Sequence, residues 1–375
     1  MVSPELFINT LQKNNVDFFA GVPDSLLKNI CAYITDHIPS DRNIITANEG
    51  SAVAVGAGHY LATGKIPLVY MQNSGIGNAV NPLLSLADEK VYSIPMILLI
   101  GWRGEPGVHD EPQHVKQGEV TLPMLETMGI EATLLPDENT AASSVIDMIA
   151  TNARRDSKPY AIIVKKGTFD KYKLQTEAVN PYTLSREDAM KCVVDNIPVN
   201  SAIVSTTGKL SRELFEYREA RQESHGHDFL TVGSMGHASS IALGIALSHP
   251  ERKIFCFDGD GAFIMHMGAL SNIGKLAPQN FIHILFNNGA HESVGGQPTL
   301  GFEIDTSAIA KACGYTQVST VERCDEIKSA LESAIDCKGP ILIEIKVGIS
   351  SRDNLGRPTT TPVQNKNAFI NFLKN

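Results

Sequence analysis

The sequence from Lys253 to Ala290 reads KIFCFDGDGAFIMHMGALSNIGKLAPQNFIHILFNNGA, and this stretch decides the fold. It contains two apolar runs, and each run ends in a polar motif: Gly259-Asp260-Gly261 after the first and Asn287-Asn288 after the second. Between the motifs lie 25 residues, 262–286, for which we predict a helix over 262–276 and then the second strand. Such apolar runs are typical of parallel strands covered on both faces. Because ligands of open parallel sheets bind beyond the carboxyl ends of strands, the two motifs predict one binding site.

Strand-like and helix-like patterns alternate along the whole chain of 375 residues. This alternation predicts an α/β protein built from open parallel sheets that are flanked by helices. The predicted strands are short β-type runs, several of them continuously apolar, at 43–46, 68–72, 96–100, 161–165, 202–205, 253–258, 281–286 and 341–346.

The length of the chain suits two domains of ordinary size. The clearest break is a polar stretch that contains Pro181. A new helix is predicted directly after it, with Ser185 as the N-cap. We therefore predict a first domain over 1–170, a linker over 171–184 and a second domain over 185–375.

Composition and charge exclude several classes of partner. Apolar residues make up 43% and charged residues 19%, and 32 basic against 41 acidic residues give a formal charge of -9. No basic run suggests nucleic acid. The six cysteines lack metal-site or C-x-x-C spacing, so we predict six thiols of a reducing compartment. Residues 1–5 lack signal-peptide features and no apolar run could span a bilayer, so we expect a cytoplasmic protein without a membrane partner.

The motif at Gly259-Asp260-Gly261 joins glycines to a carboxylate at the predicted start of a helix. Glycines let the backbone approach a phosphate, and a helix N-terminus favours an anion. Asp260 alone would repel that anion, so we predict a hard cation between them. Mg²⁺ prefers oxygen ligands and often shares them with phosphates. The predicted protein ligands are Asp260, the amide oxygen of Asn288 and a backbone carbonyl near Ala290.

Gly-Asp-Gly, its spacing and Asn-Asn together resemble the cofactor-binding motif of the thiamin-diphosphate enzyme family. The resemblance covers nearly the whole chain and implies two thiamin-diphosphate-binding-type domains, pyrimidine-binding and then diphosphate-binding. The short linker leaves no room for the middle domain of larger relatives. The alternative is a β-turn and an Asn-Gly turn that happen to share a sheet. The resemblance implies thiamin diphosphate and Mg²⁺ as cofactors, with contacts at Gly259, Asp260, Gly261, Ala262 and Asn288.

Glu49 is predicted to supply a second element that this cofactor needs. The cofactor's amino group removes its C2 proton, which requires a carboxyl group at the pyrimidine N1′ in an apolar site that raises its pKa. Glu49 follows the strand 43–46 and begins a helix rich in small residues. This segment resembles the Asn-Glu segment of the family's pyrimidine-binding domain. The alternative is a glutamate that interacts only with the helix dipole.

Other segments also resemble the family. In the loop 233–236, the Gly233 carbonyl would accept from the cofactor's amino group and Met235 would hold its two rings in a V. The alternative for Met235 is ordinary core filling. In the family the cofactor lies between domains of two subunits, so the resemblance implies at least a homodimer. The further cofactor contacts implied are Gly21, Ser74, Thr207, Gly208, Gly233, Ser234 and Met235.

Cationic and proton-carrying side chains occur in glycine-rich or turn segments, as an anionic substrate would require. We predict substrate ligands at Arg103, Lys209, Arg212 and His291. We predict that the carbon losing CO₂ is protonated by His109 or His114. Each of these residues could instead be a solvated surface charge or a loop histidine satisfied by the backbone.

Four segments resemble the phosphonopyruvate decarboxylases: 102–114, 207–215, 295–299 and 351–358. The resemblance implies decarboxylation of 3-phosphonopyruvate to phosphonoacetaldehyde in phosphonate biosynthesis. Sulfopyruvate decarboxylase is the nearest alternative, and phosphonate and sulfonate tails differ by one charge.

Two other functions remain open at this point. An acetolactate-type carboligase would add a second oxo acid and give a branched hydroxy acid instead of an aldehyde. A non-catalytic protein that binds thiamin diphosphate would not need a carboxylate that activates the cofactor, and Glu49 argues against it.

Overall fold

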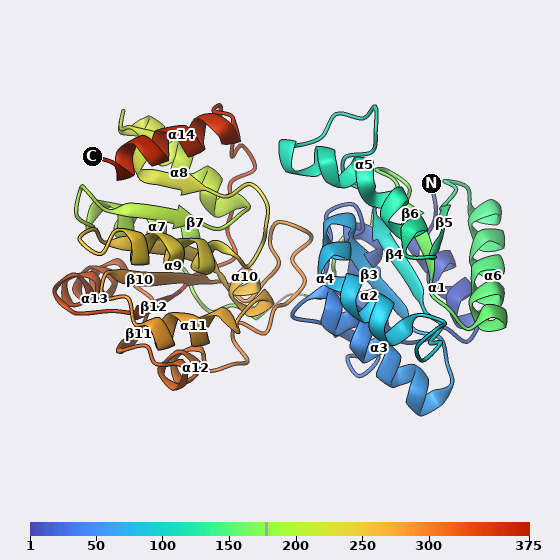
Figure 1. The fold of residues 1–375 in the computed structure, drawn as a ribbon. Coiled ribbons are helices and arrows are strands. Elements are labelled where there is room, and N and C mark those ends of the chain that lie inside the picture. The colour runs from blue at the N-terminus through green and yellow to red at the C-terminus, as the bar shows by residue number, and fades with distance from the viewer. Residues whose placement is uncertain (177–178) are drawn as a thin grey trace. The chain divides into compact units, whose positions relative to one another are not determined.

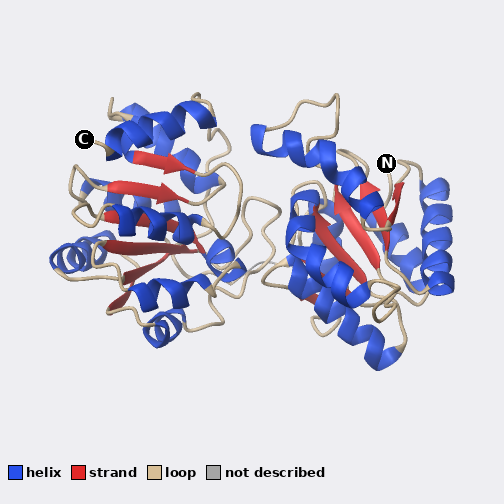
Figure 2. Cartoon of the chain, viewed as in Figure 1, coloured by secondary structure: helices blue, strands red, loops and turns tan. Residues whose placement is uncertain are grey.

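The computed structural model describes residues 1–176 and 179–375 and divides them into two compact units. The first unit consists of residues 1–176 and 291–297, and the second of residues 179–290 and 298–375. Each unit holds one six-stranded sheet with helices packed against it (Figures 1 and 2). The predicted α/β class with two open parallel sheets is therefore confirmed.

The first sheet has the strand order β2-β1-β3-β4-β6-β5, and every neighbouring pair is parallel. Its central strands are continuously apolar and buried, as expected when helices cover both faces. The strands are β1 (Phe19–Gly21), β2 (Asn43–Ile45), β3 (Leu68–Gln72), β4 (Ile97–Gly101), β5 (Glu131–Leu134) and β6 (Tyr160–Val164).

Two apolar cores lie on the two faces of this sheet. One core includes Phe7, Ile34 and Ile146 from α1, α2 and α6, and the other includes Val53 and Leu125 from α3 and α5. The helices are α1 (Pro4–Lys13), α2 (Lys28–His37), α3 (Glu49–Thr63), α4 (Ile76–Pro82), α5 (Pro112–Thr127) and α6 (Asn139–Asp156), with short turns η1 (Asn73–Gly75) and η2 (Leu83–Ala87).

The second sheet has the order β11-β12-β10-β9-β7-β8 and is also parallel throughout. Read from its other end, it follows the same plan as the first sheet: second, first, third, fourth, sixth and fifth strand of its unit. The strands are β7 (Ala202–Ser205), β8 (Asp228–Leu230), β9 (Ile254–Gly259), β10 (Phe281–Asn287), β11 (Gln317–Val321) and β12 (Ile341–Lys346).

Helices α7, α8 and α13 contribute to the core on one face of the second sheet, and α9, α11, α12 and α14 to the core on the other. The helix at Ser185 begins as predicted, because the Ser185 side chain accepts a hydrogen bond from the Asp188 backbone N–H. The elements are α7 (Arg186–Asp195), α8 (Lys209–Ala220), η3 (His225–His227), α9 (Ala238–Ser248), α10 (Asp260–Met265), α11 (Ala269–Leu276), α12 (Thr306–Cys313), α13 (Cys324–Asp336) and α14 (Pro362–Leu373).

The structure corrects two sequence predictions about elements. The single helix expected over 262–276 is two helices, because α10 ends at Met265 and α11 begins only at Ala269, after a turn that includes Gly268. Four strands were not predicted, namely β1, β5, β8 and β11. Two of them have three residues, and β5, β8 and β11 lie at sheet edges, where a strand is covered less and carries little apolar signal.

The expectation of six free thiols is wrong, because Cys192 and Cys324 form a disulfide. Cys192 lies on α7 and Cys324 begins α13, and these helices pack side by side on one face of the sheet. The two cysteines are 132 residues apart, so sequence spacing gave no signal. Among the described residues, every helix is too short or too polar to cross a membrane.

Candidate active site

Glu49 is buried at the start of α3, just beyond the second strand of the first unit. Asn48 caps the helix by accepting from the Ser51 N–H at 2.9 Å, so the Glu49 side chain is not the cap. The Asn78 amide donates to Glu49 Oε2 at 2.7 Å. A Cβ on Gly75 would overlap the Glu49 carboxylate, so the small residue at that position makes room for it. The result is a buried carboxylate with one neutral donor.

Asp24 is a second buried carboxylate at this edge, and the sequence analysis gave it no role. Its side chain is fully buried after β1, and it accepts from Gln72 Nε2 at 2.6 Å and from the Leu26 N–H at 2.9 Å. Burial raises the pKa of Asp24 despite these hydrogen bonds. Ser74 donates to Gln72 Oε1 at 2.8 Å, which extends the chain of polar groups. The signal that could have found Asp24 is its place in a Gly-Val-Pro-Asp turn after a strand.

Gly21 and Ser74, two predicted cofactor contacts, lie at the carboxyl ends of β1 and β3. A Cβ on Gly21 would overlap the Tyr70 carbonyl of the neighbouring strand, so only glycine fits there. Ser74 is exposed in the turn after β3. Both positions share the sheet edge that carries Glu49 and Asp24, because all these strands are parallel.

Arg103 follows β4 at the same edge, and its guanidinium is already engaged. It forms a two-armed ion pair with Asp110, and Nη1 donates to Ser25 Oγ at 2.8 Å. The hydrogen bonds that Arg103 donates to Asp110 raise the pKa of Arg103. Burial alone would raise the pKa of Asp110, but the hydrogen bonds that it accepts from Arg103 and the backbone lower it. Asp110 also accepts from the Gly104 N–H, so the pair closes the loop between β4 and α5.

That loop presents the two candidate proton donors. His109 is exposed, one residue before Asp110, and His114 lies partly buried in the first turn of α5. A Cβ on Gly104 would overlap the His114 carbonyl, so the loop packs closely against the start of the helix. The ion pair of Arg103 therefore fixes the loop. This loop carries His109 and packs against His114 at the start of α5.

Asp260 begins α10 directly after β9, and it is buried. Burial raises its pKa to about 6, against a hydrogen bond from the Thr299 hydroxyl. A Cβ on Gly301 would lie 2.8 Å from Asp260 Oδ2 and 2.5 Å from Asn287 Oδ1. Only glycine at this position can therefore pack so closely against both oxygen atoms, which come from the ends of neighbouring strands. Thr299 lies in the segment 295–299 noted in the sequence but had no predicted role, and Gly301 was not noted, because both come from a distant loop.

The paired asparagines after β10 have different surroundings. Asn287 is a structural residue, since its amide donates to the Gly301 carbonyl at 2.6 Å and to Glu344 Oε1 at 2.7 Å. The Asn288 amide oxygen accepts from the Ala290 N–H at 3.1 Å, which folds the turn after the strand. β9 and β10 are direct neighbours, so Asp260 and Asn288 follow adjacent strand ends.

These donors fit Mg²⁺. A buried carboxylate whose ionised form is disfavoured by burial, an amide oxygen and a backbone carbonyl are the oxygen ligands this ion prefers. Gly301 packs against Asp260 Oδ2 and Asn287 Oδ1, and any larger side chain there would collide with both oxygens. Gly259, Gly261 and Ala262 stand at the same strand end, where the backbone can approach a diphosphate.

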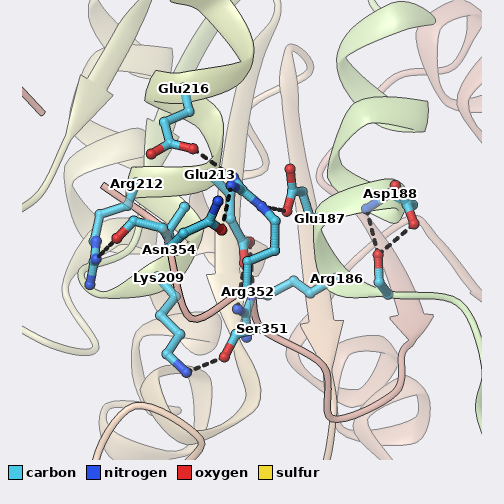
Figure 3. Close-up of polar contacts among 12 residues, drawn as sticks. Arg186, Glu187, Asp188, Lys209, Arg212, Glu213, Glu216, Ser351, Arg352 and Asn354 are labelled. Carbon is cyan, nitrogen blue, oxygen red and sulfur yellow. Dashed lines mark hydrogen bonds and ion pairs between the residues drawn. The ribbon is translucent and has the colours of Figure 1, made fainter. Parts of the chain in front are cut away.

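The loop after β7 holds the predicted residues Thr207 and Gly208, and the predicted residues Lys209 and Arg212 lie on α8, directly after this loop. Gly208 has a φ of 106°, which favours glycine, and α8 begins at the next residue. Figure 3 shows Lys209 pointing to the hydroxyl of Ser351, to which it donates. Arg212 donates to the backbone carbonyls of Leu355 and Gly356. Arg212 therefore holds a segment of the chain in place.

The loop after β8 contains Gly233, Ser234 and Met235. Ser234 has a φ of 53° and Gly236 a φ of 82°, so the backbone turns sharply there. The Ser234 carbonyl accepts from the His237 N–H at 3.1 Å. Met235 is only partly buried, which differs from ordinary core filling.

His291 lies in the segment 291–297, which groups with the first unit. Its backbone N–H donates to the Gln297 carbonyl at 2.8 Å and closes this loop. The other predicted residues form two groups, each at the carboxyl edge of one sheet. The first sheet carries Gly21, Glu49, Ser74 and Arg103, with His109 and His114 nearby. The second carries Thr207, Gly208, Lys209, Arg212, Gly233, Ser234, Met235, Gly259, Asp260, Gly261, Ala262, Asn288 and Ala290.

Known proteins match this arrangement. Residues 1–125 match the N-terminal thiamine pyrophosphate (TPP) binding domain of thiamine pyrophosphate enzymes, and residues 206–345 match their C-terminal TPP binding domain. A phosphonopyruvate decarboxylase of Streptomyces viridochromogenes is 34% identical over 94% of this chain and 90% of its own length. The chain belongs to the thiamin-diphosphate-dependent decarboxylase family.

Two other family members are similar over most of their length. A phosphonopyruvate decarboxylase of Streptomyces hygroscopicus is 34% identical over 99% of this chain and 94% of its own. A sulfopyruvate decarboxylase of Methanosarcina acetivorans is 30% identical over 86% of this chain and 85% of its own. This decarboxylase therefore shares two short domains with both kinds of relative, and the described units leave no room for a middle domain.

Proposed function

We propose that this decarboxylase converts 3-phosphonopyruvate to phosphonoacetaldehyde and CO₂, as a step in phosphonate biosynthesis. The observation that carries the substrate is the 34% identity to phosphonopyruvate decarboxylases over nearly the full chain, against 30% to the sulfopyruvate decarboxylase. In the reaction the bond between the 2-oxo carbon and the carboxylate breaks. A proton then replaces the carboxylate on that carbon.

Thiamin diphosphate, when bound, supplies the electron sink that accepts the pair left behind by CO₂. We propose that Mg²⁺ is held by Asp260, Asn288 and the backbone at Ala290. The buried carboxylate of Asp260, and its place beside Asn288 at adjacent strand ends, support this assignment. Gly208 and the glycines around Asp260 would let the backbone approach the diphosphate.

Glu49 is proposed to hold the proton at the pyrimidine nitrogen. Its burial, its neutral partner Asn78 and the room that Gly75 leaves for its carboxylate support this role. A role limited to the helix end is less consistent with the structure, since Asn48 already provides the cap.

Lys209 is proposed as the ligand of the phosphonate tail. Its ammonium is at the start of α8, at the sheet edge that carries the diphosphate motif. Arg212 is committed to backbone carbonyls and Arg103 to Asp110, so we assign both to holding loops in place. His109 or His114 would return the proton to the reacting carbon, and the Arg103 pair fixes their loop.

The proposal includes a homo-oligomer of at least two copies. The carboxylate of Glu49 and the diphosphate motif stand on different units, and the family builds its sites from different subunits. Equilibrium sedimentation of the purified protein with thiamin diphosphate and Mg²⁺ would give a dimer or a larger assembly. A monomer that remains active would contradict this part of the proposal.

The test of the function is CO₂ release from phosphonopyruvate, sulfopyruvate and pyruvate, measured side by side with purified protein, thiamin diphosphate and Mg²⁺. We expect kcat/KM to be highest for phosphonopyruvate, and the product to be an aldehyde. A preference for sulfopyruvate would change the substrate assignment. A branched hydroxy acid as the main product would replace decarboxylation by carboligation, and binding without turnover would leave a cofactor-binding protein.

A further inference from the structure

The segment Ser351–Gly356, which we call the C-terminal strap, crosses the start of α8. It follows β12 and therefore leaves the sheet at the edge that carries Asp260 and Asn288. Before the strap begins, the Gly348 N–H donates to the Leu184 carbonyl at 2.8 Å. The strap has no helix or strand of its own, so side-chain contacts must define its path.

One face of α8 supplies most of these contacts. Lys209, Arg212 and Glu216 lie three or four residues apart and project from the same side of the helix. Lys209 donates to Ser351, Arg212 donates to two strap carbonyls, and Glu216 accepts from the Gly356 N–H. Leu355 is buried, which gives the strap one apolar anchor. These contacts put the strap directly beside Lys209.

Arg352 joins the strap to two helices at once. Its Nε donates to Glu187 on α7 at 2.7 Å, and its Nη2 donates to Glu216 on α8 at 2.6 Å (Figure 3). Arg352 and Glu216 are both partly exposed, with 39% and 33% of their side-chain surface accessible. Ion pairs of this exposure contribute little to global stability. Their two-helix geometry instead restricts where the strap can lie.

Ser351 connects the position of the strap to the side chain of Lys209. It precedes Arg352 in the chain, so the ion pairs that hold Arg352 also restrict the backbone position of Ser351. That hydroxyl accepts from the Lys209 ammonium. A lysine ammonium sits on a flexible stem, and a fixed acceptor reduces the number of directions in which it can point.

We propose that Arg352 is a positioning residue for substrate specificity, and that it fixes the strap so that Ser351 directs Lys209 toward the oxyanion tail of the substrate. The proposal rests on the proposed function, in which Lys209 binds a phosphonate. Arg352 itself makes no contact with the substrate. Its two carboxylate partners account for its charge, and its effect passes through the backbone to Ser351.

The first experiment compares steady-state kinetics of wild-type holoenzyme and R352A with phosphonopyruvate and pyruvate. We expect KM for phosphonopyruvate to rise about tenfold, the effect of weakening roughly one charge-assisted hydrogen bond, while kcat stays within about twofold. Pyruvate has no tail, so its KM should stay within about twofold. R352K, which can reach only one of the two carboxylates, should show an intermediate KM.

R323A is the matched control. Arg323 is also an exposed arginine with two acidic partners, Asp325 and Glu326, but these lie at the start of α13. We expect R323A to leave both substrates unaffected. An equal loss of kcat/KM for phosphonopyruvate and pyruvate in R352A would overturn the proposal, because it would show a general structural effect.

A binding measurement separates this proposal from the proposed function. Methylphosphonate is titrated into wild-type, R352A and S351A holoenzyme by calorimetry, which requires no turnover. We expect its affinity to fall about tenfold in both variants. Unchanged affinity would overturn the role of the strap even if phosphonopyruvate is the substrate. Reduced affinity would support the strap even if wild-type protein released no CO₂ from phosphonopyruvate.

Discussion

The two units share one strand order, yet their sheet edges carry different chemistry. In the first unit the second strand leads to Glu49, a buried carboxylate with a neutral partner. In the second unit the third strand leads to Asp260, a buried carboxylate beside an asparagine turn and the closely packed Gly301. The sheet fixes where the loops emerge, and the loop residues decide the chemistry. Under the proposed function, the repeated fold thus places a proton-holding group and a metal-binding group by the same means.

Replacing Glu49 by glutamine should give the largest difference between the roles of the two sheet edges, because it should affect turnover but not cofactor binding. We expect kcat to fall by about a thousandfold, within the range of a lost acid–base group, while the affinity for thiamin diphosphate changes little. E138Q is the control, because Glu138 is an exposed glutamate that caps α6. This variant shows the effect of losing a glutamate at the start of a helix that has no proposed catalytic role. Near-normal turnover in E49Q would remove Glu49 from the chemistry.

The D260A variant tests the role proposed for the second unit, which is to bind the cofactor through Mg²⁺. We expect the Mg²⁺-dependent affinity for thiamin diphosphate to fall by at least about a hundredfold, because a direct metal ligand is removed. D305A is the control, since Asp305 caps α12 and its loss should affect helix stability only. Cofactor affinity can be measured by fluorescence or calorimetry. Undiminished retention of the cofactor in D260A would contradict the metal site.

The pKa of Asp260, raised to about 6 by burial, predicts a pH dependence confined to the second unit. Without metal, the folded protein binds this proton more tightly than the unfolded chain does, so stability falls as pH rises from about 4 to 6. Metal binding needs the ionised form. Apparent Mg²⁺ affinity should therefore weaken by up to about tenfold per pH unit below pH 6.

The control for this titration is D260N, which keeps an amide oxygen and loses the titrating group. The Mg²⁺ affinity of D260N should be weaker than that of wild type, and it should not change with the titration of residue 260 between about pH 5 and 7. Calorimetric titrations of Mg²⁺ at several pH values measure both proteins. An identical slope in wild type and D260N would assign the pH dependence to another residue.

Two glycines of the first unit test a smaller claim, that Gly75 makes room for the Glu49 carboxylate. A Cβ on Gly75 would overlap the Glu49 carboxylate, whereas a Cβ on Gly58 of α3 would meet nothing within 4 Å. G75A should destabilise the protein by about 1–3 kcal/mol and reduce kcat, as expected for an added methyl group in a packed site. G58A should be neutral or slightly stabilising. Thermal unfolding and turnover of both variants check the difference.

Much of the fold could be predicted because it depends on local signals. The strands Leu68–Gln72, Ala202–Ser205 and Ile341–Lys346 have the predicted bounds, since central parallel strands are continuously apolar. Ser185 caps its helix through its own side chain. The edge strand Glu131–Leu134 escaped prediction, because partial exposure removes the apolar pattern.

The surroundings of the candidate site were less predictable, because they depend on contacts between distant residues. The partner of Asp260 is Thr299, 39 residues away, and Arg103 is neutralised by Asp110 across a loop. The Cys192–Cys324 disulfide joins helices 132 residues apart. Residue types and spacing reveal which groups could do chemistry. They do not reveal which cations the fold has already paired.

The most direct test of the comparison between the two edges is exchange of the C2 proton of bound thiamin diphosphate for deuterium, measured by quenched-flow NMR in wild-type protein and E49Q. Wild-type protein should exchange this proton about a thousandfold faster than E49Q, with the cofactor bound equally well by both. Equal exchange rates in the two proteins would contradict the claim that a carboxylate of the first unit activates the cofactor held by the second.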